Sequence, residues 1–199
     1  MGTNYGFDRN FTNTVHNNLA VPQIYEELGW SVQDIDSDAA EYADMFEGID
    51  YFLTNQHGQT VTVQERFREY KYHPYTDFTI RFEREFNPHV ERHLSEYYKL
   101  NADYFVYGII NTSKFNVENA TEFVKFAVVD LHVIKQLTDE GKIVIDRSVS
   151  GLKCVMQNGV MHCPVNYNRD GSSSFFPVDI KFLVEYFSEY HPVIFKKGI

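Results

Sequence analysis

The alternation of hydrophobic and polar residues predicts a block of β-strands in the first half of the chain. Residues 48–54 (GIDYFLT) and 60–70 (TVTVQERFREY) are rich in β-branched and aromatic side chains, and the stretch between them, NQHGQ, has the composition of a turn. This pattern is typical of a β-hairpin. Residues 76–85 alternate large apolar and polar side chains, as a half-buried strand does. We therefore expect a third antiparallel strand beside the hairpin.

Helical patterns precede this block. Apolar residues recur at helical spacing over residues 15–30, and we expect Pro22 to break this helix into two pieces. Residues 37–46 (SDAAEYADMF) predict a second, short helix that is capped by Ser37 or Asp38. The chain therefore enters the strands from a helical N-terminal segment.

The second half mixes helices and strands. The predicted elements are a helix over 88–100, a buried strand over 103–110, a strand and then a helix over 125–142, a hairpin over 152–165 around Asn158-Gly159, and an amphipathic helix over 176–190. This order indicates an α/β or α+β fold with a mixed central sheet flanked by helices. We expect one domain over residues 1–199, in which residues 12–110 form a core and residues 111–199 complete it.

Composition and charge narrow the class of protein. The chain has 199 residues, 18 basic and 28 acidic, and a net charge of −10. A chain of this length buries enough surface to fold without disulfide or metal staples. No segment has the roughly 18 consecutive apolar residues of a membrane span, and the two cysteines indicate free thiols in a reducing compartment. We expect a soluble, cytoplasmic protein.

The charge is unevenly distributed. Residues 1–50 contain ten acidic residues and a single basic one, Arg9, whereas residues 51–100 contain seven of each. An acidic protein repels polyanions at long range, so any contact with nucleic acid needs a local basic patch or a bound cation. The acidic N-terminal segment supports an alternative, a module that binds a basic partner.

Asp50 is the first candidate for chemistry, because it lies in an apolar strand, where an unpaired charge is costly. If Thr54 pairs with Val61 across the turn, Asp50 lies opposite Glu65 on the same face. Two carboxylates at that distance repel each other unless a cation or a proton lies between them. We expect a hard cation, Mg²⁺ or Mn²⁺, at this place.

The alternation along the second strand leaves a different register open. Glu65 has the parity of the apolar residues Val61, Val63 and Phe67, whereas Gln64 and Arg66 have the parity of the polar face. A β-bulge near residues 64–65 reconciles the two assignments. We keep Gln64, Glu65 and Arg66 as candidates and rank Glu65 first, because a carboxylate binds a hard cation better than an amide does.

These residues resemble a known family. Residues 48–50 (GID), a turn and residues 63–68 (VQERFR) are similar to the PD-(D/E)xK, or restriction-endonuclease-like, superfamily. The resemblance covers residues 12–110 and places Asp50 at the aspartate, Gln64 or Glu65 at the second acidic position, and Glu26 or Glu27 at the helical glutamate. With Gln64 as the start of the second motif, Arg66 falls at the lysine.

The resemblance implies a metal-dependent deoxyribonuclease in which Asp50, Glu65 and Glu27 hold the metal. The chain departs from the family's pattern at two positions. No proline precedes Asp50, and Arg66 stands where the family has a lysine. Arginine stays protonated, so it stabilises negative charge but does not act as a base. We expect cleavage of DNA by a homodimer or together with a partner protein; the alternative is an inactive nuclease-like fold or a DNA mimic that inhibits a basic partner.

A second group of residues fits nucleic-acid binding. Arg68, Lys71, Arg81 and Arg84 are interleaved with tyrosines 70, 72 and 75, and such side chains contact phosphates and stack on bases. The alternative is a solvated strand face of mixed charge. We expect structural roles for Cys154, His162 and Cys163, because no second pair has zinc-ligand spacing, and a surface or capping role for His16. Phosphate-binding loops and the common hydrolase motifs are absent from the sequence.

Overall fold

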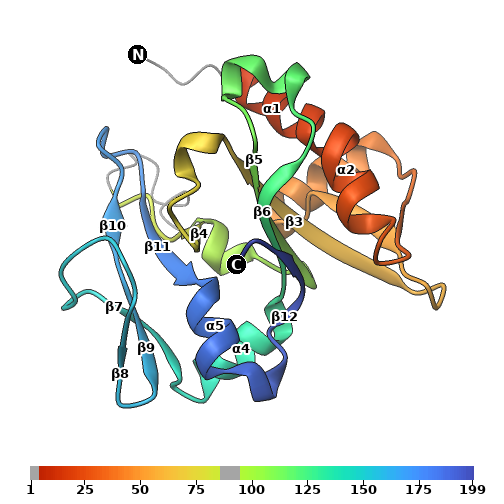
Figure 1. Ribbon diagram of the computed structural model, residues 1–199. Helices are drawn as coiled ribbons and strands as arrows, with labels where there is room; N and C mark the ends of the chain where they lie inside the picture. Colours follow the sequence, from red (N-terminus) through yellow and green to blue (C-terminus); the bar gives the residue numbers. More distant parts are fainter. Residues whose placement is uncertain (1–4, 86–94) are drawn as a thin grey trace.

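The computed structural model describes the chain over residues 5–85 and 95–199, with side chains from Phe7 onward. A six-stranded mixed sheet with the order β1-β2-β3-β5-β6-β12 lies at its centre (Figure 1). Its strands are β1 (Ser31–Val32), β2 (Tyr51–Thr54), β3 (Thr60–Arg68), β5 (Tyr104–Ile110), β6 (Phe123–Asp130) and β12 (Val193–Lys197). This mixed sheet with helices around it is the predicted α/β fold class.

The predicted hairpin is confirmed, and it sets the geometry of the sheet. β2 and β3 pair in antiparallel fashion with Tyr51 opposite Val63 and Thr54 opposite Thr60. β3 is parallel to β5 and β5 is antiparallel to β6. β5 is buried along almost its whole length, which explains the continuous apolar run that predicted it.

One face of the sheet is covered by the N-terminal helices. α1 (Tyr5–Val15) continues into the π-helical segment η1 (His16–Tyr25), and Pro22 lies inside η1 rather than at a break. The predicted break is therefore wrong, because the wide π-helical turns accommodate the proline. Buried side chains of these helices pack on the apolar residues of β2, β3 and β6 that face them, and together they form a core cluster.

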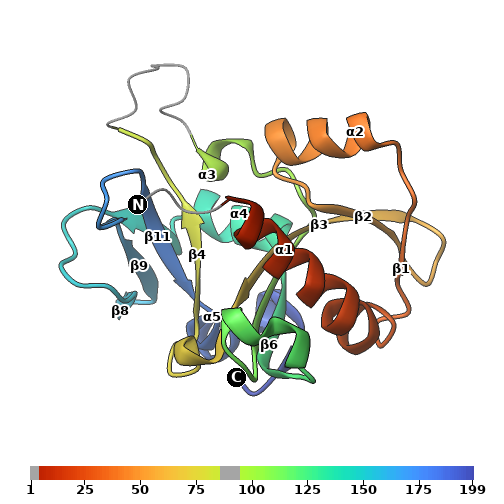
Figure 2. The ribbon, with the colours of Figure 1, turned by 90° about the horizontal axis from the view of Figure 1, so that it is seen from above.

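A second layer covers the opposite face, and Figure 2 shows its small sheets to the left of β3. It consists of the sheet β10-β11-β4, the sheet β7-β9-β8 and the helices α4 (Leu131–Asp139) and α5 (Ile180–Tyr186). The strands are β4 (Asp77–Arg81), β7 (Ile143–Asp146), β8 (Val155–Gln157), β9 (Val160–Pro164), β10 (Asn166–Tyr167) and β11 (Ser174–Asp179). A second core cluster joins this layer to β5 and β6.

The place of β4 corrects a prediction. We expected residues 76–85 beside the hairpin, but β4 pairs with β11, with Ile80 opposite Phe176, and β5 takes the place next to β3. Phe78, Thr79 and Ile80 are all buried, so β4 has no solvent-facing side over this stretch. A strand buried on both faces belongs between layers, and its partner comes from nearly a hundred residues later in the chain.

Several helix boundaries also differ from the prediction. α2 (Ser37–Tyr42) and η2 (Ala43–Glu47) are capped by Asp36, whose side chain accepts hydrogen bonds from the amides of residues 38 and 39. α5 is shorter than predicted, because residues 174–179 pair as β11 before it begins. α3 (Glu96–Lys99) is the described end of the helix expected over 88–100; the rest lies outside the described residues.

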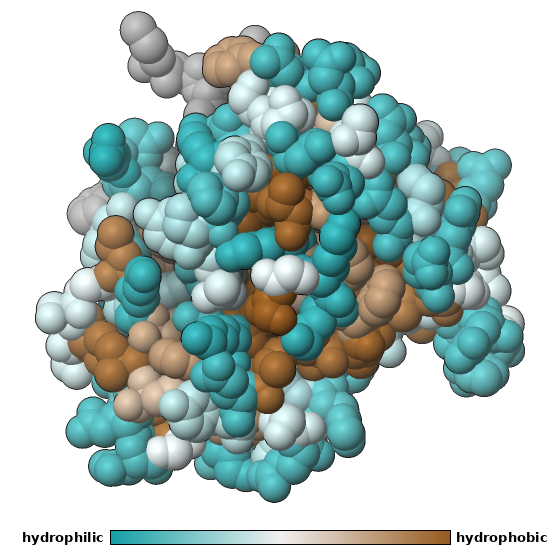
Figure 3. Space-filling model, in the orientation of Figure 1, coloured by the Kyte–Doolittle hydropathy of each residue, from teal (hydrophilic) through white to brown (hydrophobic). Residues whose placement is uncertain are grey.

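Other predictions hold. β6 runs into α4 with Asp130 as the N-cap, and β8 and β9 form a hairpin in which Asn158 and Gly159 both have positive φ. Cys154 and Cys163 are buried free thiols, with their sulfurs 3.7 Å apart. No helix within the described ranges is long and apolar enough to span a membrane. On the face seen in Figure 3, hydrophobic residues show in the middle and at the lower left, among hydrophilic ones.

Candidate functional site

Asp50 lies at the entrance of β2, directly after a tight turn. Gly48 ends η2 in the left-handed conformation (φ 61°), and the amide of Asp50 then donates to the carbonyl of Val63. Asp50 Oδ2 accepts hydrogen bonds from Gln64 Nε2 at 2.8 Å and from the amide of Glu65 at 2.6 Å. Asp50 is therefore held by the facing strand through one amide side chain and one backbone N–H.

This arrangement corrects the predicted register. The ladder pairs Thr54 with Thr60, not with Val61, so continuing it by one residue beyond Tyr51 and Val63 sets Asp50 opposite Gln64. Neither β3 ladder contains a bulge at residues 64–65. The alternation along β3 offers a second assignment, in which Gln64 and Arg66 lie on the polar face. The structure has this assignment, and Asp50 lies on the same face.

The environment of Asp50 leaves its carboxylate short of positive charge. Burial raises the pKa of Asp50 to about 8, and the Glu65 carboxylate contributes to the increase, whereas the Glu65 amide and the Arg66 guanidinium lower it. Charged carboxylates with so little compensation are uncommon unless a cation or a proton joins them. A cation close to Asp50 would lower this pKa and favour the charged carboxylate.

Glu65 points to the opposite face of β3, into a buried network that we call the Glu65 network: Glu65, His16, Tyr25 and Tyr51. Glu65 Oε1 accepts a hydrogen bond from the Tyr25 hydroxyl and lies 2.8 Å from His16 Nδ1. The His16 ring stacks on Tyr51 at 3.6 Å between centroids. The predicted surface role of His16 is therefore wrong; this histidine and Tyr25 fasten η1 to the sheet.

The predicted set of three metal ligands does not come together. Glu65 is turned away from Asp50, and Glu27 is exposed and lines a shallow hollow with Phe195 and Lys197. Within residues 5–85 and 95–199, no three His, Cys, Asp or Glu side chains form a group suited to a metal ion. What remains is the Asp50 carboxylate beside the Gln64 amide, the minimum that fits a Mg²⁺ ion whose other ligands are water and substrate phosphate.

Arg66 follows Gln64 on the same face of β3 and meets α3. Its Nη2 lies 2.6 Å from Glu96 Oε2, and this carboxylate raises the pKa of Arg66. Glu96 also accepts a long bond, 3.5 Å, from the amide of Arg81. Burial lowers the pKa of Arg81, and the charges of Arg66 and Arg84 lower it further. Two guanidiniums are thus held close together, one on each of the facing strands β3 and β4.

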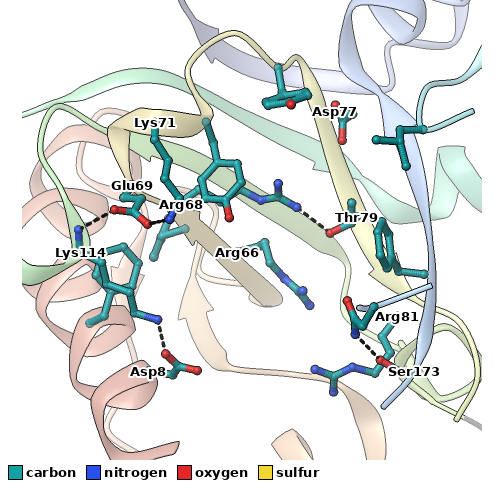
Figure 4. A pocket seen from close by; sticks show the side chains of 17 residues that line it. Asp8, Arg66, Arg68, Glu69, Lys71, Asp77, Thr79, Arg81, Lys114 and Ser173 are labelled. Carbon is teal, nitrogen blue, oxygen red and sulfur yellow. Dashed lines mark hydrogen bonds and ion pairs between the residues drawn. The ribbon is translucent and has the colours of Figure 1, made fainter. Parts of the chain in front are cut away.

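These arginines line a cavity of about 670 Å³ between β3, β4, β11 and α1, which we call the arginine cleft. Its charged lining consists of Arg66, Arg68, Lys71, Arg81 and Lys114 with Asp8, Glu69 and Asp77. In Figure 4, Arg66 and Arg81 point into the space between β3 and β4, and Arg68 reaches across it to Thr79, at 2.8 Å. Among the described residues the lining has two more cations than acids, and Glu96, which pairs with Arg66, adds one acid beside it, on a protein of net charge −10.

The rim of the cleft is a turn rich in tyrosines. η3 (Tyr70–Tyr72) and the residues to Tyr75 connect β3 to β4, and we call residues 70–75 the tyrosine turn. Arg68 and Lys71 lie 5.0 and 5.1 Å from the centre of the Tyr72 ring, a distance typical of cation–π contacts. Tyr72 and Tyr75 both line the cleft, so aromatic and cationic groups share one surface.

Three of the four predicted nucleic-acid contacts therefore come together. Arg68, Lys71 and Arg81 line the arginine cleft, whereas Arg84 does not. Lys114 was missed: it comes from η5 (Lys114–Asn119), contacts Asp8 of α1 and lines the same cleft. No spacing in the sequence relates residue 114 to residues 66–81, so only the packing of η5 against α1 reveals it.

A comparison of the chain with models of protein families, with curated proteins and with solved structures found no match.

Proposed function

We propose that this protein is a metal-dependent nuclease that hydrolyses phosphodiester bonds of DNA beside Asp50. The observation that carries the proposal is the shared face of Asp50, Gln64, Arg66 and Arg68. Alternate residues of a strand are about 6.5 Å apart, so Gln64 and Arg68 are separated by about 13 Å along β3. The side chains of Gln64, Arg66 and Arg68 thus form a row that begins beside the Asp50 carboxylate and ends in the arginine cleft.

The first part of the proposal concerns the cation. Asp50 and Gln64 would hold Mg²⁺, which in such sites polarises the phosphate and activates a bound water. Gln64 donates its amide N–H to Asp50 and thereby leaves its carbonyl oxygen available as a ligand. The Glu65 amide fixes the second bond to Asp50, so the carboxylate is oriented before any ligand arrives.

The second part concerns the phosphate. Arg66 cannot act as a base, but its planar group donates to the oxygens on which negative charge develops. Glu96 holds the Arg66 guanidinium in place from one side. Arg68 and Arg81 are placed further along the cleft, where they contact the phosphates that follow in the strand.

The experiment that tests this proposal measures cleavage of labelled single-stranded and duplex DNA in Mg²⁺, Mn²⁺ or EDTA. Asp50→Ala is expected to lower the metal-dependent rate by more than about 100-fold, since changes in the outer shell of metal sites already cost 10–100-fold. Glu27→Ala is the matched control, an acidic residue from the predicted set that the structure leaves in solvent. Its rate is expected to equal that of the wild type.

A gain-of-function variant sharpens the test. Gln64→Glu supplies the second carboxylate that the site lacks, so it is expected to lower the Mg²⁺ concentration needed for half-maximal cleavage. Equal rates for wild type and Asp50→Ala would contradict the proposal and identify a co-purifying nuclease. Absence of cleavage from wild type and Gln64→Glu in both metals would contradict it as well, and would favour the inactive, interaction-only alternative.

A further inference from the structure

The arginines of the arginine cleft are recessed, whereas Lys71 at its rim is exposed. The Arg66 side chain is 28% exposed and lies between β3, β4 and α3, and Arg81 is half-buried on the facing strand. A double helix is a stiff, convex cylinder and touches side chains that project from a surface. Recessed guanidiniums are reached more easily by a thin, flexible strand that can enter the cleft.

The rim adds aromatic surface where such a strand would leave the cleft. Tyr75 is 39% exposed and lines the cleft, and Tyr70 is 46% exposed at the start of the turn. Tyr70 stacks on His73 at 4.6 Å between ring centroids, and Tyr75 packs at a tilt against Tyr72 at 6.4 Å, so each exposed ring is supported by contact with another ring. Supported, solvent-facing rings are platforms on which unpaired bases stack without sequence preference.

We propose that the arginine cleft and the tyrosine turn bind single-stranded nucleic acid, with its phosphates on Arg66, Arg68 and Arg81 and an unpaired base on Tyr75. The alternation of cations and rings in this short segment gives both halves of a nucleotide a partner. The bases of a duplex are already stacked and paired, so they gain nothing from the tyrosine turn. The proposal deepens the proposed function, on which it rests for the phosphate contacts, by naming the form of the substrate.

The test is a binding measurement in EDTA, so that it does not depend on cleavage. Fluorescence anisotropy compares three labelled ligands of about 20 nucleotides: a mixed-sequence single strand, the same sequence as a blunt duplex, and a single strand of abasic sites. The wild type is expected to bind the single strand about tenfold more tightly than either of the others, because stacking on one ring accounts for about this factor.

Variants assign the effect to the ring. Tyr75→Ala is expected to weaken binding of the single strand about tenfold and to leave binding of the abasic strand unchanged. Tyr75→Phe keeps the ring and is expected to bind like the wild type. Tyr186→Ala is the matched control, since Tyr186 is an exposed tyrosine on α5 that does not line the cleft. If Tyr75→Ala does not fold, the abasic ligand on the wild type gives the same comparison.

Two results would overturn the inference. One is a duplex that binds as tightly as the single strand; the other is an abasic strand that binds as tightly as the natural one. Either result leaves the nuclease proposal standing, if Asp50-dependent cleavage of duplex DNA is observed. Conversely, tight and base-dependent binding without any cleavage would refute the nuclease and keep the single-strand site.

Discussion

The two faces of β3 place their polar side chains in different surroundings, a buried core on one side and a cavity on the other. On the helix side, Glu65 is fully buried, and its partners His16 and Tyr25 are buried as well. On the other side, Arg66 and Arg68 line the arginine cleft and are partly exposed, and each has a side-chain partner, Glu96 or Thr79. A buried charge on β3 is therefore not by itself a sign of a binding site; the charges on the cleft side are the candidates because they also face a cavity.

The Glu65 network on the helix side is buried, and its hydrogen bonds engage one of the two Glu65 oxygens. Tyr25 and His16 bind one oxygen of Glu65, and among the described residues the other oxygen, Oε2, has no hydrogen-bond partner. Burial and the Glu65 charge raise the pKa of Tyr25, so its hydroxyl remains a donor. The network thereby holds η1 against β3. The backbone amide of Glu65 in turn donates a hydrogen bond to Asp50, on the other face of the strand.

The largest effect is expected from Glu65→Ala. The variant leaves two buried polar side chains without their partner, and the free energy of unfolding should fall by about 3 kcal/mol. Chemical denaturation measures this difference. Tyr25→Phe removes a single donor and should cost less. Arg68→Ala, on the cleft side of the same strand, should stay within about 1 kcal/mol of the wild type. Equal losses for Glu65→Ala and Arg68→Ala would refute the contrast between the faces.

An intermediate effect is expected from pH acting on Asp50. Its pKa is about 8 in the folded protein and about 3.9 in an unfolded chain. The folded state therefore binds the Asp50 proton more tightly than the unfolded state does. Protonated Asp50 stabilises the folded protein at low pH, and this contribution to stability is lost as the pH rises through about 8. Asp50→Asn cannot ionise and lacks this loss.

Denaturation in EDTA at pH 5 and at pH 8.5 checks this expectation. The wild type should lose more stability between the two values than Asp50→Asn does, and Asp50→Asn should be the more stable protein at pH 8.5. If the two proteins changed in parallel with pH, Asp50 would not be the poorly compensated carboxylate that the structure indicates.

The smallest effect concerns the salt dependence of binding. Each phosphate contact on a single strand contributes about 0.7 to the slope of log K against log salt. Arg68→Ala should reduce the slope by about this amount. Arg147→Ala should not, because Arg147 pairs with Glu83 and Glu85 and does not line the cleft. Equal slopes for the two variants would place the bound strand elsewhere.

The hairpin of β2 and β3 illustrates what local pattern determines. Its strands, its turn and the parity of Gln64 and Arg66 followed from alternation, because neighbouring side chains of a strand point to opposite faces. The register did not follow, since a turn of this length allows two pairings that differ by one residue. That single residue decides whether Asp50 faces a carboxylate or an amide, and the structure has the amide.

The sequence alone determined the mixed α/β class and most of the strands. It also singled out Asp50, a carboxylate in an apolar strand, and a run of cationic residues with tyrosines between them. These features are local, because they depend on the period of a strand and on the composition of a turn. Tertiary structure decided that β4 lies in a second layer, that Glu65 belongs to His16 and Tyr25, and that Lys114 joins the cleft. Each of these depends on contacts between residues roughly 40 to 100 positions apart, and the free energy that selects such contacts comes from packing that no local pattern records.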